Sequence, residues 1–327
     1  MKFTSTMLLA ATLAAFALPA TGAQAAKFNA KLSLDVQKGN PKEVAAEDFA
    51  EAVRKRTNGD VVIKIFPNSL LGGETEAAQG IRLGSVQMGV ITSSVLASWV
   101  PQVQVLDLPF LVTSDAQAAA ISGPLTKELG PKFEAQGFHL LGFSVNGGRN
   151  LMSTFPITKP ADVKGKKMRV IQSPLFVSTW KAVGANPVPI PAPEIYNALQ
   201  TGVADYFDNT ASNYLTFKFY EVAPYYTKLD YIYAFGTWVV ADNWWKKLPD
   251  NYKAIVTEEA VKAQKEAETL TEKADKAALA ETEKNGAKIS AISDKTPWIK
   301  LMQPVQDEFA AKIPDAGALI KVIKATK

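Results

Sequence analysis

Two arginines stand where a guanidinium could hold an anion. Arg149 follows Asn146-Gly147-Gly148 directly after an apolar stretch, and Arg169 lies within Met168–Ile171, which has the pattern of a strand. Residues at strand ends in α/β folds face the crevice between halves of the fold. A guanidinium stays charged and matches a carboxylate with two parallel hydrogen bonds. Spacing alone fits Arg169 equally well as a surface residue beside the basic stretch 164–167.

Several other chemistries are excluded by composition. The 327 residues contain no cysteine and one histidine, His139, so thiolate sites, cysteine nucleophiles and multi-histidine metal sites are ruled out. We expect His139, within the apolar run 138–143, to be a structural strand residue rather than a functional one. The formal net charge of +4 is too small for a nucleic-acid-binding surface.

Enzyme motifs are incomplete. The stretch 142–147 approaches a nucleophile elbow around Ser144, but Asn146 occupies the position of the second glycine. No glycine-rich nucleotide motif is present. Carboxylate pairs such as Glu74 and Glu76 could perform acid–base chemistry, yet such residues are more often solvated charges at a helix start.

The N-terminus predicts export. Lys2 precedes an apolar stretch over 7–18, Pro19 ends it, and Ala23-Gln24-Ala25 offers the small-residue pattern of a cleavage site. Residues 1–25 are therefore expected to be a signal peptide, and the mature chain to be soluble and periplasmic. Without cysteine it has no lipid anchor on that residue type.

Apolar periodicity alternates between strands and helices. Strands are expected at 31–36, 61–66 and 86–91, with helices at 43–55 and 74–83 between them, which is typical of a parallel sheet with crossover helices. The helix over 116–134 is expected to break at Gly123-Pro124. Two α/β lobes with a hinge and a cleft follow, with chain crossings expected near 146–162 and 208–214.

The C-terminal third is expected to be helical. The stretch 251–285 is rich in Ala, Glu and Lys, and its charges favour a solvated helix face. A helix that binds a coiled-coil partner is the alternative interpretation. Aromatic side chains cluster between 225 and 245; we expect most in the core, with Phe235 or Trp238 as candidates for stacking on a ligand.

Ordered motifs over nearly all of the mature chain resemble one family, the periplasmic solute-binding subunits of TRAP (tripartite ATP-independent periplasmic) transporters, of the dicarboxylate-binding-protein (DctP) type. The stretches that carry the resemblance are Asn146-Gly147-Gly148-Arg149, 157–170, 191–205, Phe219-Tyr220-Glu221-Val222-Ala223, Trp245-Lys246-Lys247-Leu248-Pro249, 84–89 and Leu108-Pro109-Phe110.

The resemblance implies roles residue by residue. Arg169 matches the arginine that clamps a ligand carboxylate, Arg149 a second basic residue nearby, and Asn209 an asparagine that hydrogen-bonds the same group. Gln172 matches a polar lining position, and further residues fall on segments that line the pocket: Gln37, Ser93, Phe235 and Trp238. The sequence departs from the family pattern at Tyr206-Phe207-Asp208, which leaves the ligand class open. No metal or cofactor is expected, because the motif of the metal-using branch is absent.

The resemblance also implies an architecture and partners. We expect a two-lobed periplasmic binding protein fold with a hinge and a long C-terminal bracing helix. The expected divisions are 26–148 with a later returning segment, 149–242 for most of the second lobe, and 243–327 for the helical region. The protein would capture a small carboxylate, such as a sugar acid or dicarboxylate, and deliver it to TRAP membrane permease subunits.

Two other function classes are compatible with the sequence. One is a periplasmic enzyme that acts on a sugar acid through paired carboxylates. The other is an interaction protein that uses the long helix over 251–285. A turnover assay on the ligand separates the first from a binding protein, and a screen that finds no small ligand favours the second.

Overall fold

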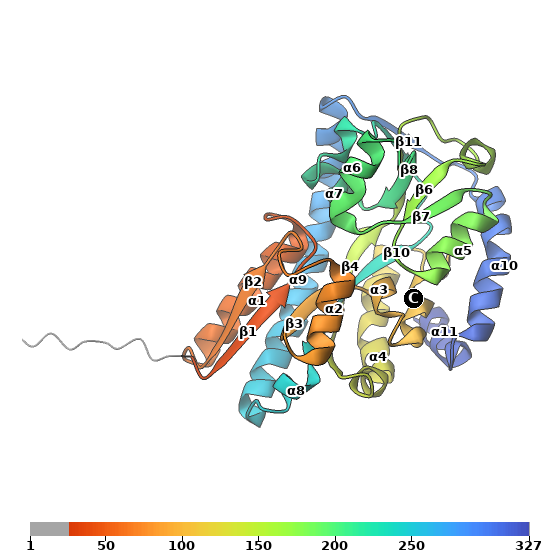
Figure 1. Cartoon of the computed structure of the whole chain (residues 1–327). Coiled ribbons are helices and arrows are strands. Elements are labelled where there is room, and N and C mark those ends of the chain that lie inside the picture. Colours follow the sequence, from red (N-terminus) through yellow and green to blue (C-terminus); the bar gives the residue numbers. More distant parts are fainter. Residues whose placement is uncertain (1–25, 327) are drawn as a thin grey trace, which may run out of the picture.

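Two β-sheets, one in each half of the molecule, organise the computed structural model, which describes residues 26–326 (Figure 1). The predicted signal peptide, residues 1–25, lies outside the described residues. The first sheet has the order β2-β1-β3-β10-β4, in which β10 is antiparallel to both of its neighbours. Its strands are β1 (Phe28–Ser33), β2 (Val61–Phe66), β3 (Met88–Thr92), β4 (Phe138–Gly148) and β10 (Tyr233–Ala241).

The second sheet has the order β11-β9-β5-β8-β6-β7 and mixes parallel and antiparallel pairs. Its strands are β5 (Asn150–Ser153), β6 (Lys167–Val170), β7 (Asn186–Pro189), β8 (Tyr206–Asn209), β9 (Tyr225–Lys228) and β11 (Lys288–Ala291). Strand β6 lies beside β8, so Arg169 on β6 pairs with Phe207, two residues before the end of β8. This pairing places Arg169 and Asn209 near the same edge of the sheet.

Two direct strand-to-strand connections join the sheets, and a hydrogen bond links them. Strand β4 of the first sheet ends at Gly148, and β5 of the second begins at Asn150, so Arg149 alone joins them. The chain returns through 229–232, between β9 and β10, and the Arg149 backbone N–H donates to the Ile232 carbonyl at 2.8 Å. The second crossing expected near 208–214 was wrong, because β8 and β9 on either side of that segment both belong to the second sheet.

Helices cover both sheets and link them. They are α1 (Pro41–Arg56), α2 (Glu74–Leu83), α3 (Ser93–Leu96), α4 (Asp115–Glu134), α5 (Pro174–Ala182), α6 (Ile195–Gln200), α7 (Ala211–Thr216), α8 (Asp242–Trp245), α9 (Asp250–Lys284), α10 (Thr296–Lys312) and α11 (Ala316–Ala325), with short 3-10 turns at Pro101–Asp107, Pro160–Val163, Ala192–Glu194 and Phe219–Glu221.

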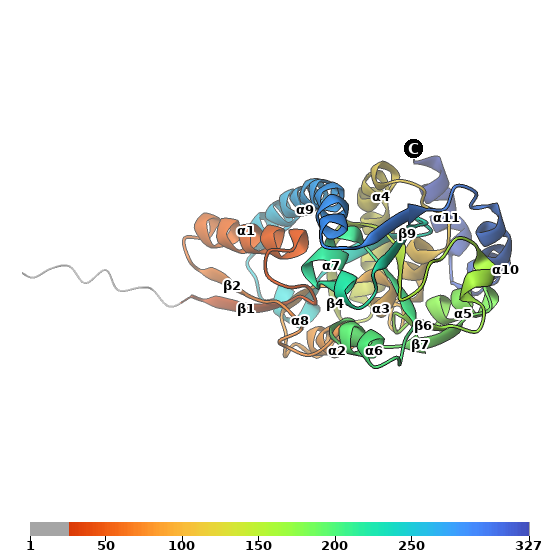
Figure 2. The ribbon, with the colours of Figure 1, turned by 90° about the horizontal axis from the view of Figure 1, so that it is seen from above.

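The 35-residue helix α9 spans the two halves. It packs on α1 and β4 in the first half and on α7 in the second, as the top view shows (Figure 2). Two glycines of β4 with positive φ permit this approach. A Cβ at Gly142 would lie 2.6 Å from Gln264 Oε1, and one at Gly147 would lie 2.6 Å from Asp275 Oδ2.

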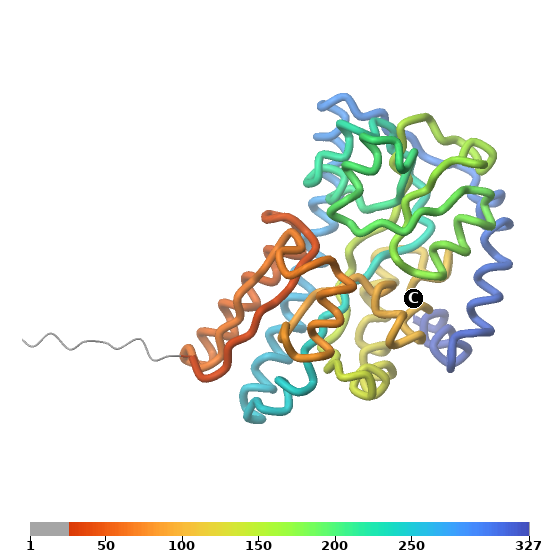
Figure 3. Tube along the Cα trace, viewed as in Figure 1, coloured from red at the N-terminus to blue at the C-terminus, as the bar shows by residue number. Residues whose placement is uncertain are grey.

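The C-terminal helices form a second link. Helix α10 packs on α5 of the second half, and α11 packs on α4 of the first, so this segment runs along the side of both (Figure 3). The Trp298 ring of α10 stands edge-on to Trp180 of α5, with centroids 6.3 Å apart. None of the helices within 26–326 is long and apolar enough to cross a membrane.

Helix α4 is continuous, and the predicted break at Gly123-Pro124 was wrong. The face of α4 toward β4 buries apolar side chains on both sides of Pro124, among them Ile121 and Leu125. Proline removes one backbone hydrogen bond in a helix interior. Burial of a Leu or Ile side chain contributes about 1.5–3 kcal/mol, so the packed face outweighs that loss.

Candidate binding site between the two sheets

A cavity of about 910 Å³, its open mouth included, lies between the two halves. The first half contributes loop and helix residues from the carboxyl ends of β1 and β3, and the second contributes residues from the ends of β6, β7 and β8. Thr271 of α9 adds to the lining. The polar and charged side chains that line the cavity are Asp35, Asn40, Lys42, Ser69, Glu74, Thr92, Asn146, Arg149, Arg169, Gln172, Asn209, Thr210, Ser212, Asn213 and Thr271.

Arg169 enters the cavity from β6 as a buried cation. Its side chain is only slightly exposed, and its Nε donates to the Ile190 carbonyl at 2.8 Å. Within residues 26–326 no carboxylate lies within ion-pair distance of Arg169, and its two terminal nitrogens have no hydrogen-bond partner. Burial, followed by the nearby Arg149 charge, lowers the pKa of Arg169 to about 10. The fork of this guanidinium is therefore available to an anion in the cavity.

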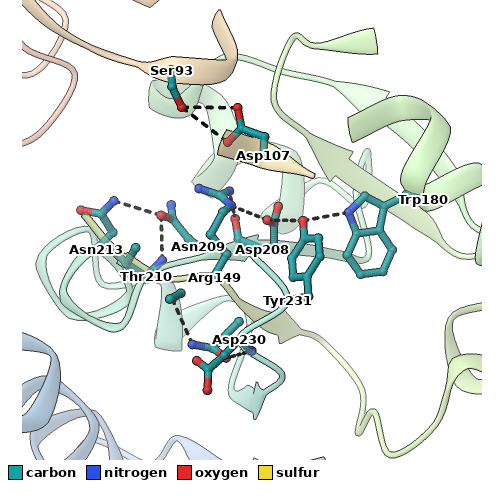
Figure 4. A network of polar contacts seen from close by, with 12 residues as sticks. Ser93, Asp107, Arg149, Trp180, Asp208, Asn209, Thr210, Asn213, Asp230 and Tyr231 are labelled. Carbon is teal, nitrogen blue, oxygen red and sulfur yellow. Dashed lines mark hydrogen bonds and ion pairs between the residues drawn. The ribbon is translucent and has the colours of Figure 1, made fainter. Parts of the chain in front are cut away.

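Arg149 is also buried, but its charge is neutralised within the protein. Its Nε donates to Asp208 Oδ2 at 2.5 Å, and one terminal nitrogen donates to the Asp208 carbonyl at 2.7 Å. Burial disfavours the charged form, yet the Asp208 carboxylate dominates and holds the pKa of Arg149 above its usual value. The Tyr231 hydroxyl donates to the same Asp208 oxygen at 2.6 Å and accepts from Trp180 Nε1 (Figure 4). Arg149 thus ties both chain crossings to β8.

Asn209 and Gln172 line the cavity together with Arg169. Asn209 Oδ1 accepts from the Thr210 backbone N–H at 2.9 Å and from Asn213 Nδ2 at 3.0 Å. Gln172 is exposed at the rim, where its Oε1 accepts from Thr75 Oγ1 of α2 at 3.2 Å. The structure therefore brings four of the predicted site residues together: Arg149, Arg169, Gln172 and Asn209.

The other four predicted residues are not part of the lining. Gln37 and Ser93 are neighbours of the lining residues Val36 and Thr92. Ser93 is fully buried, with its hydroxyl directed at Asp107 Oδ2 at 3.3 Å. A sequence pattern locates the segment, but which residue of a tight strand-to-helix turn faces the cavity depends on the local backbone.

Phe235 and Trp238 are core residues of β10. Phe235 stands edge-on to Phe143, whereas its neighbour Ala234 lines the cavity. Trp238 packs edge-on to Phe49 and donates from Nε1 to Ser144 Oγ at 3.0 Å. Successive strand residues point to opposite faces, and the cavity side takes the small residue. Both rings thus stand where the aromatic cluster was mostly expected, in the core.

Two charged residues that sequence reasoning did not assign, Lys42 and Asp35, lie on the first-half wall with Glu74, which the sequence favoured as a solvated charge at a helix start. Lys42 Nζ and Asp35 Oδ1 form a buried ion pair at 2.8 Å. Glu74 Oε1 accepts from the Thr92 backbone N–H at 2.6 Å, and burial, followed by the Asp35 charge, raises the pKa of Glu74 to about 7. The sequence feature that could have indicated this group is Asp35, a charged residue inside the apolar run 32–36. Its partner Lys42 lies in the first turn of α1.

The remaining chemical candidates of the sequence stand apart from the cavity lining. Ser144 is fully buried and holds Trp238, and His139 stacks on Trp245 with centroids 4.0 Å apart. Glu76, paired with Glu74 in the sequence, is exposed on α2. Within residues 26–326, no three His, Asp or Glu side chains gather as a metal-binding group would.

The departure at 206–208 falls behind the cavity wall. Tyr206 and Phe207 are fully buried, with Tyr206 edge-on to Trp180 and Phe207 edge-on to Phe219. Neither ring lines the cavity. Asp208, the third residue, is the partner of Arg149. The unusual residues therefore build the support beneath the site and not its surface.

Known proteins share this arrangement over almost the whole chain. The family model described as bacterial extracellular solute-binding protein, family 7, matches residues 32–313. The chain belongs to this family. A solute-binding protein of Roseobacter denitrificans is 33% identical over 264 residues, which cover 80% of this chain and 81% of the relative.

Solved structures of solute-binding proteins agree with the fold. The sugar acid binding protein of Advenella mimigardefordensis, solved with galactonate, has a TM-score of 0.89 at 27% identity and covers 93% of this chain and 100% of that one. A TRAP periplasmic solute-binding protein of Sulfurospirillum deleyianum, solved with succinate, has a TM-score of 0.86 at 31% identity and covers 92% and 100%. This family 7 member is thus a TRAP-type solute-binding protein with the two-lobed α/β fold and long helix that the sequence predicted.

Proposed function

We propose that this protein captures a small organic acid in the cavity between its halves, with the ligand carboxylate on Arg169. The observation that carries the proposal is the buried guanidinium of Arg169, which has no acidic partner within the described residues. A buried charge is costly unless it is paired. An anionic ligand supplies the missing charge, and the Asn209 amide lies in the same lining to hydrogen-bond it.

The charges around the cavity favour a ligand with one carboxylate and several hydroxyls. Arg149 is paired with Asp208, and Lys42 with Asp35, so Arg169 is the one cation of the lining without an ion-pair partner in residues 26–326. Across from it, Glu74 and Asp35 offer carboxylate oxygens. Those oxygens accept hydrogen bonds from hydroxyls but repel a second carboxylate. We infer that sugar acids are preferred to dicarboxylates. The similar protein solved with galactonate supports this preference, whereas the one solved with succinate shows that both ligand classes must be tested.

Closure of the two halves around the ligand explains how binding can serve transport. A ligand that contacts both halves stabilises the closed form. We propose that the mature protein, after cleavage of residues 1–25, carries the acid through the periplasm to TRAP membrane permease subunits. Its role is binding and release, without turnover of the ligand.

The test is calorimetry of the mature chain with galactonate, glucuronate, succinate and an uncharged sugar. We expect binding of the acids, with the sugar acids tighter, and no binding of the uncharged sugar. Arg169→Met should abolish binding, whereas Arg54→Met, on the exposed surface of α1, should leave it unchanged. Binding retained by Arg169→Met would refute the assignment. NMR of the ligand after prolonged incubation should show it intact, and conversion would instead favour an enzyme.

A further inference from the structure

Three side-chain amides form a continuous chain across the cavity, from one half of the molecule to the other. Asn40, at the start of α1, donates from Nδ2 to Asn213 Oδ1 of α7 at 2.9 Å. Asn213 in turn donates from Nδ2 to Asn209 Oδ1 at 3.0 Å. All three residues line the cavity, and Figure 4 shows the second-half end of the chain around Asn209, Thr210 and Asn213.

Backbone N–H groups fix the direction of this chain at both ends. The Lys42 N–H donates to Asn40 Oδ1 at 3.0 Å, as expected of a helix N-cap. The Thr210 N–H donates to Asn209 Oδ1 at 2.9 Å. A backbone N–H can only donate, so each terminal amide must present its oxygen there. The amide of Asn213 then has one orientation that satisfies both neighbours.

This fixed direction leaves the Asn209 Nδ2 group as a donor without a partner in residues 26–326. Asn209 Oδ1 is occupied by two donors. The same amide lines the cavity with Arg169. A carboxylate accepts hydrogen bonds and cannot donate them, so Asn209 is useful to an acid only in this orientation.

The two ends of the chain belong to different halves. Asn40 precedes α1 of the first half, whereas Asn209 and Asn213 lie on β8 and α7 of the second. The link between Asn40 and Asn213 therefore exists only when the halves are together. When they separate, Asn213 loses the donor to its oxygen, so its amide is held less firmly. The Thr210 N–H is then the remaining firm restraint on the Asn209 amide.

We propose that Asn40 and Asn213 are positioning residues, which lock the Asn209 amide N–H on the ligand carboxylate when the cleft closes. Closure and the hydrogen bond to the ligand then support each other, since a coupling between two equilibria is reciprocal. This inference rests on the proposed function, because it takes the ligand to be an acid held by Arg169 and Asn209. It adds a reason why an acid, and not any cavity-filling solute, stabilises the closed form.

The decisive variant is Asn40→Ser, which keeps an N-cap oxygen for Lys42 but is too short to reach Asn213. With galactonate as the probe, we expect the dissociation constant to rise about fivefold to tenfold, the usual value of one hydrogen bond. The change should lie mainly in the dissociation rate measured by stopped-flow tryptophan fluorescence. The melting temperature of the ligand-free protein should stay unchanged.

A double-mutant cycle separates positioning from simple contact across the cleft. In an Asn209→Ser background, Asn40→Ser should cost little more, because the amide that it positions is gone. The matched control is Thr75→Ala, which removes the other hydrogen bond across the cleft, to Gln172 Oε1, and touches no amide of the chain. Its effect should add fully to that of Asn209→Ser.

Full additivity of Asn40→Ser with Asn209→Ser would overturn the inference, as would an unchanged dissociation constant. If Asn40→Ser fails to fold, Asn213→Ala tests the same link from the second half. If the wild-type protein binds no acid in the panel, the proposed function fails instead, and the two failures are therefore distinguishable.

Discussion

Arg149 and Arg169 line one cavity, but among residues 26–326 only Arg149 has an acidic partner. The carboxylate of Asp208 lies 2.5 Å from Arg149 Nε, whereas Arg169 Nε reaches only the Ile190 carbonyl. The first arginine is built into the junction of the two sheets, where it holds the hinge strands together. The second keeps its terminal nitrogens for the ligand. Arg149 thus has a structural role, and Arg169 is the arginine available for ligand binding.

Replacement of Arg169 should stabilise the ligand-free protein while it destroys binding. Removal of an unpaired buried charge in favour of an apolar side chain relieves its desolvation cost. We expect Arg169→Met to raise the melting temperature without ligand by roughly 2–4 °C, the usual effect of about 1 kcal/mol in a chain of this size. Differential scanning fluorimetry with and without galactonate measures both effects. A variant that melts below wild type without ligand would contradict this account of Arg169.

The Arg149–Asp208 pair should behave in the opposite way. Asp208→Asn keeps the shape of the side chain but leaves Arg149 buried without a counter-charge, so we expect a loss of about 3–5 kcal/mol in the free energy of unfolding. The control is Glu51→Gln, which breaks the exposed Arg54–Glu51 pair and should leave the free energy of unfolding nearly unchanged. Urea unfolding of both variants measures the difference. Equal losses would show that the buried pair has no special role.

The sequence predicted the periodic parts of the fold well. The strand 61–66 and the helix 74–83 have the bounds that apolar spacing and glycine punctuation indicated. The sequence did not predict strand β5, because Asn150–Ser153 is four residues long and follows β4 after one residue, without a turn signal. Short strands of this kind depend on their partners in the sheet and not on local periodicity.

The site could be predicted only where a local rule or the family resemblance places a side chain. The rule that strand ends face the crevice indicated Arg169, the resemblance implied Asn209, and both line the cavity. The Lys42–Asp35 pair and the Asn40–Asn213 hydrogen bond depend on tertiary geometry, which no spacing encodes. The predicted residue Phe235 is one position away from the lining residue Ala234. The register of β10 in the sheet decides which of the two faces the cavity, and the sequence does not reveal that register.

Asp107 should make the protein less stable as the pH rises. Burial, against the opposing charge of Arg149, raises the pKa of this carboxyl to about 7, while its unfolded value is about 4. Between these values the folded state binds the extra proton, so this group lowers stability progressively from about pH 4 to pH 7. We expect Asp107→Asn to gain stability over wild type from pH 5 to pH 8. Thermal melts across this range check it, and a difference independent of pH would contradict it.

Glu74 should make the pH dependence of binding differ between ligand classes. Its pKa of about 7 means that it ionises in the neutral range, where the acid ligands are already charged. A ligand hydroxyl donates best to the ionised carboxylate, so galactonate should bind more tightly as the pH rises from 6 to 8. A second carboxylate is repelled by ionised Glu74 and accepts from the protonated form, so succinate should bind more weakly over the same range. A shift of half to one pKa unit on binding corresponds to a change of roughly threefold to tenfold in each direction. Calorimetry at the two pH values should show affinities that change in opposite directions for the two ligands. Both changes should be absent in Glu74→Gln and retained in the exposed control Glu76→Gln. Changes in the same direction for both ligands would show that Glu74 does not select between them.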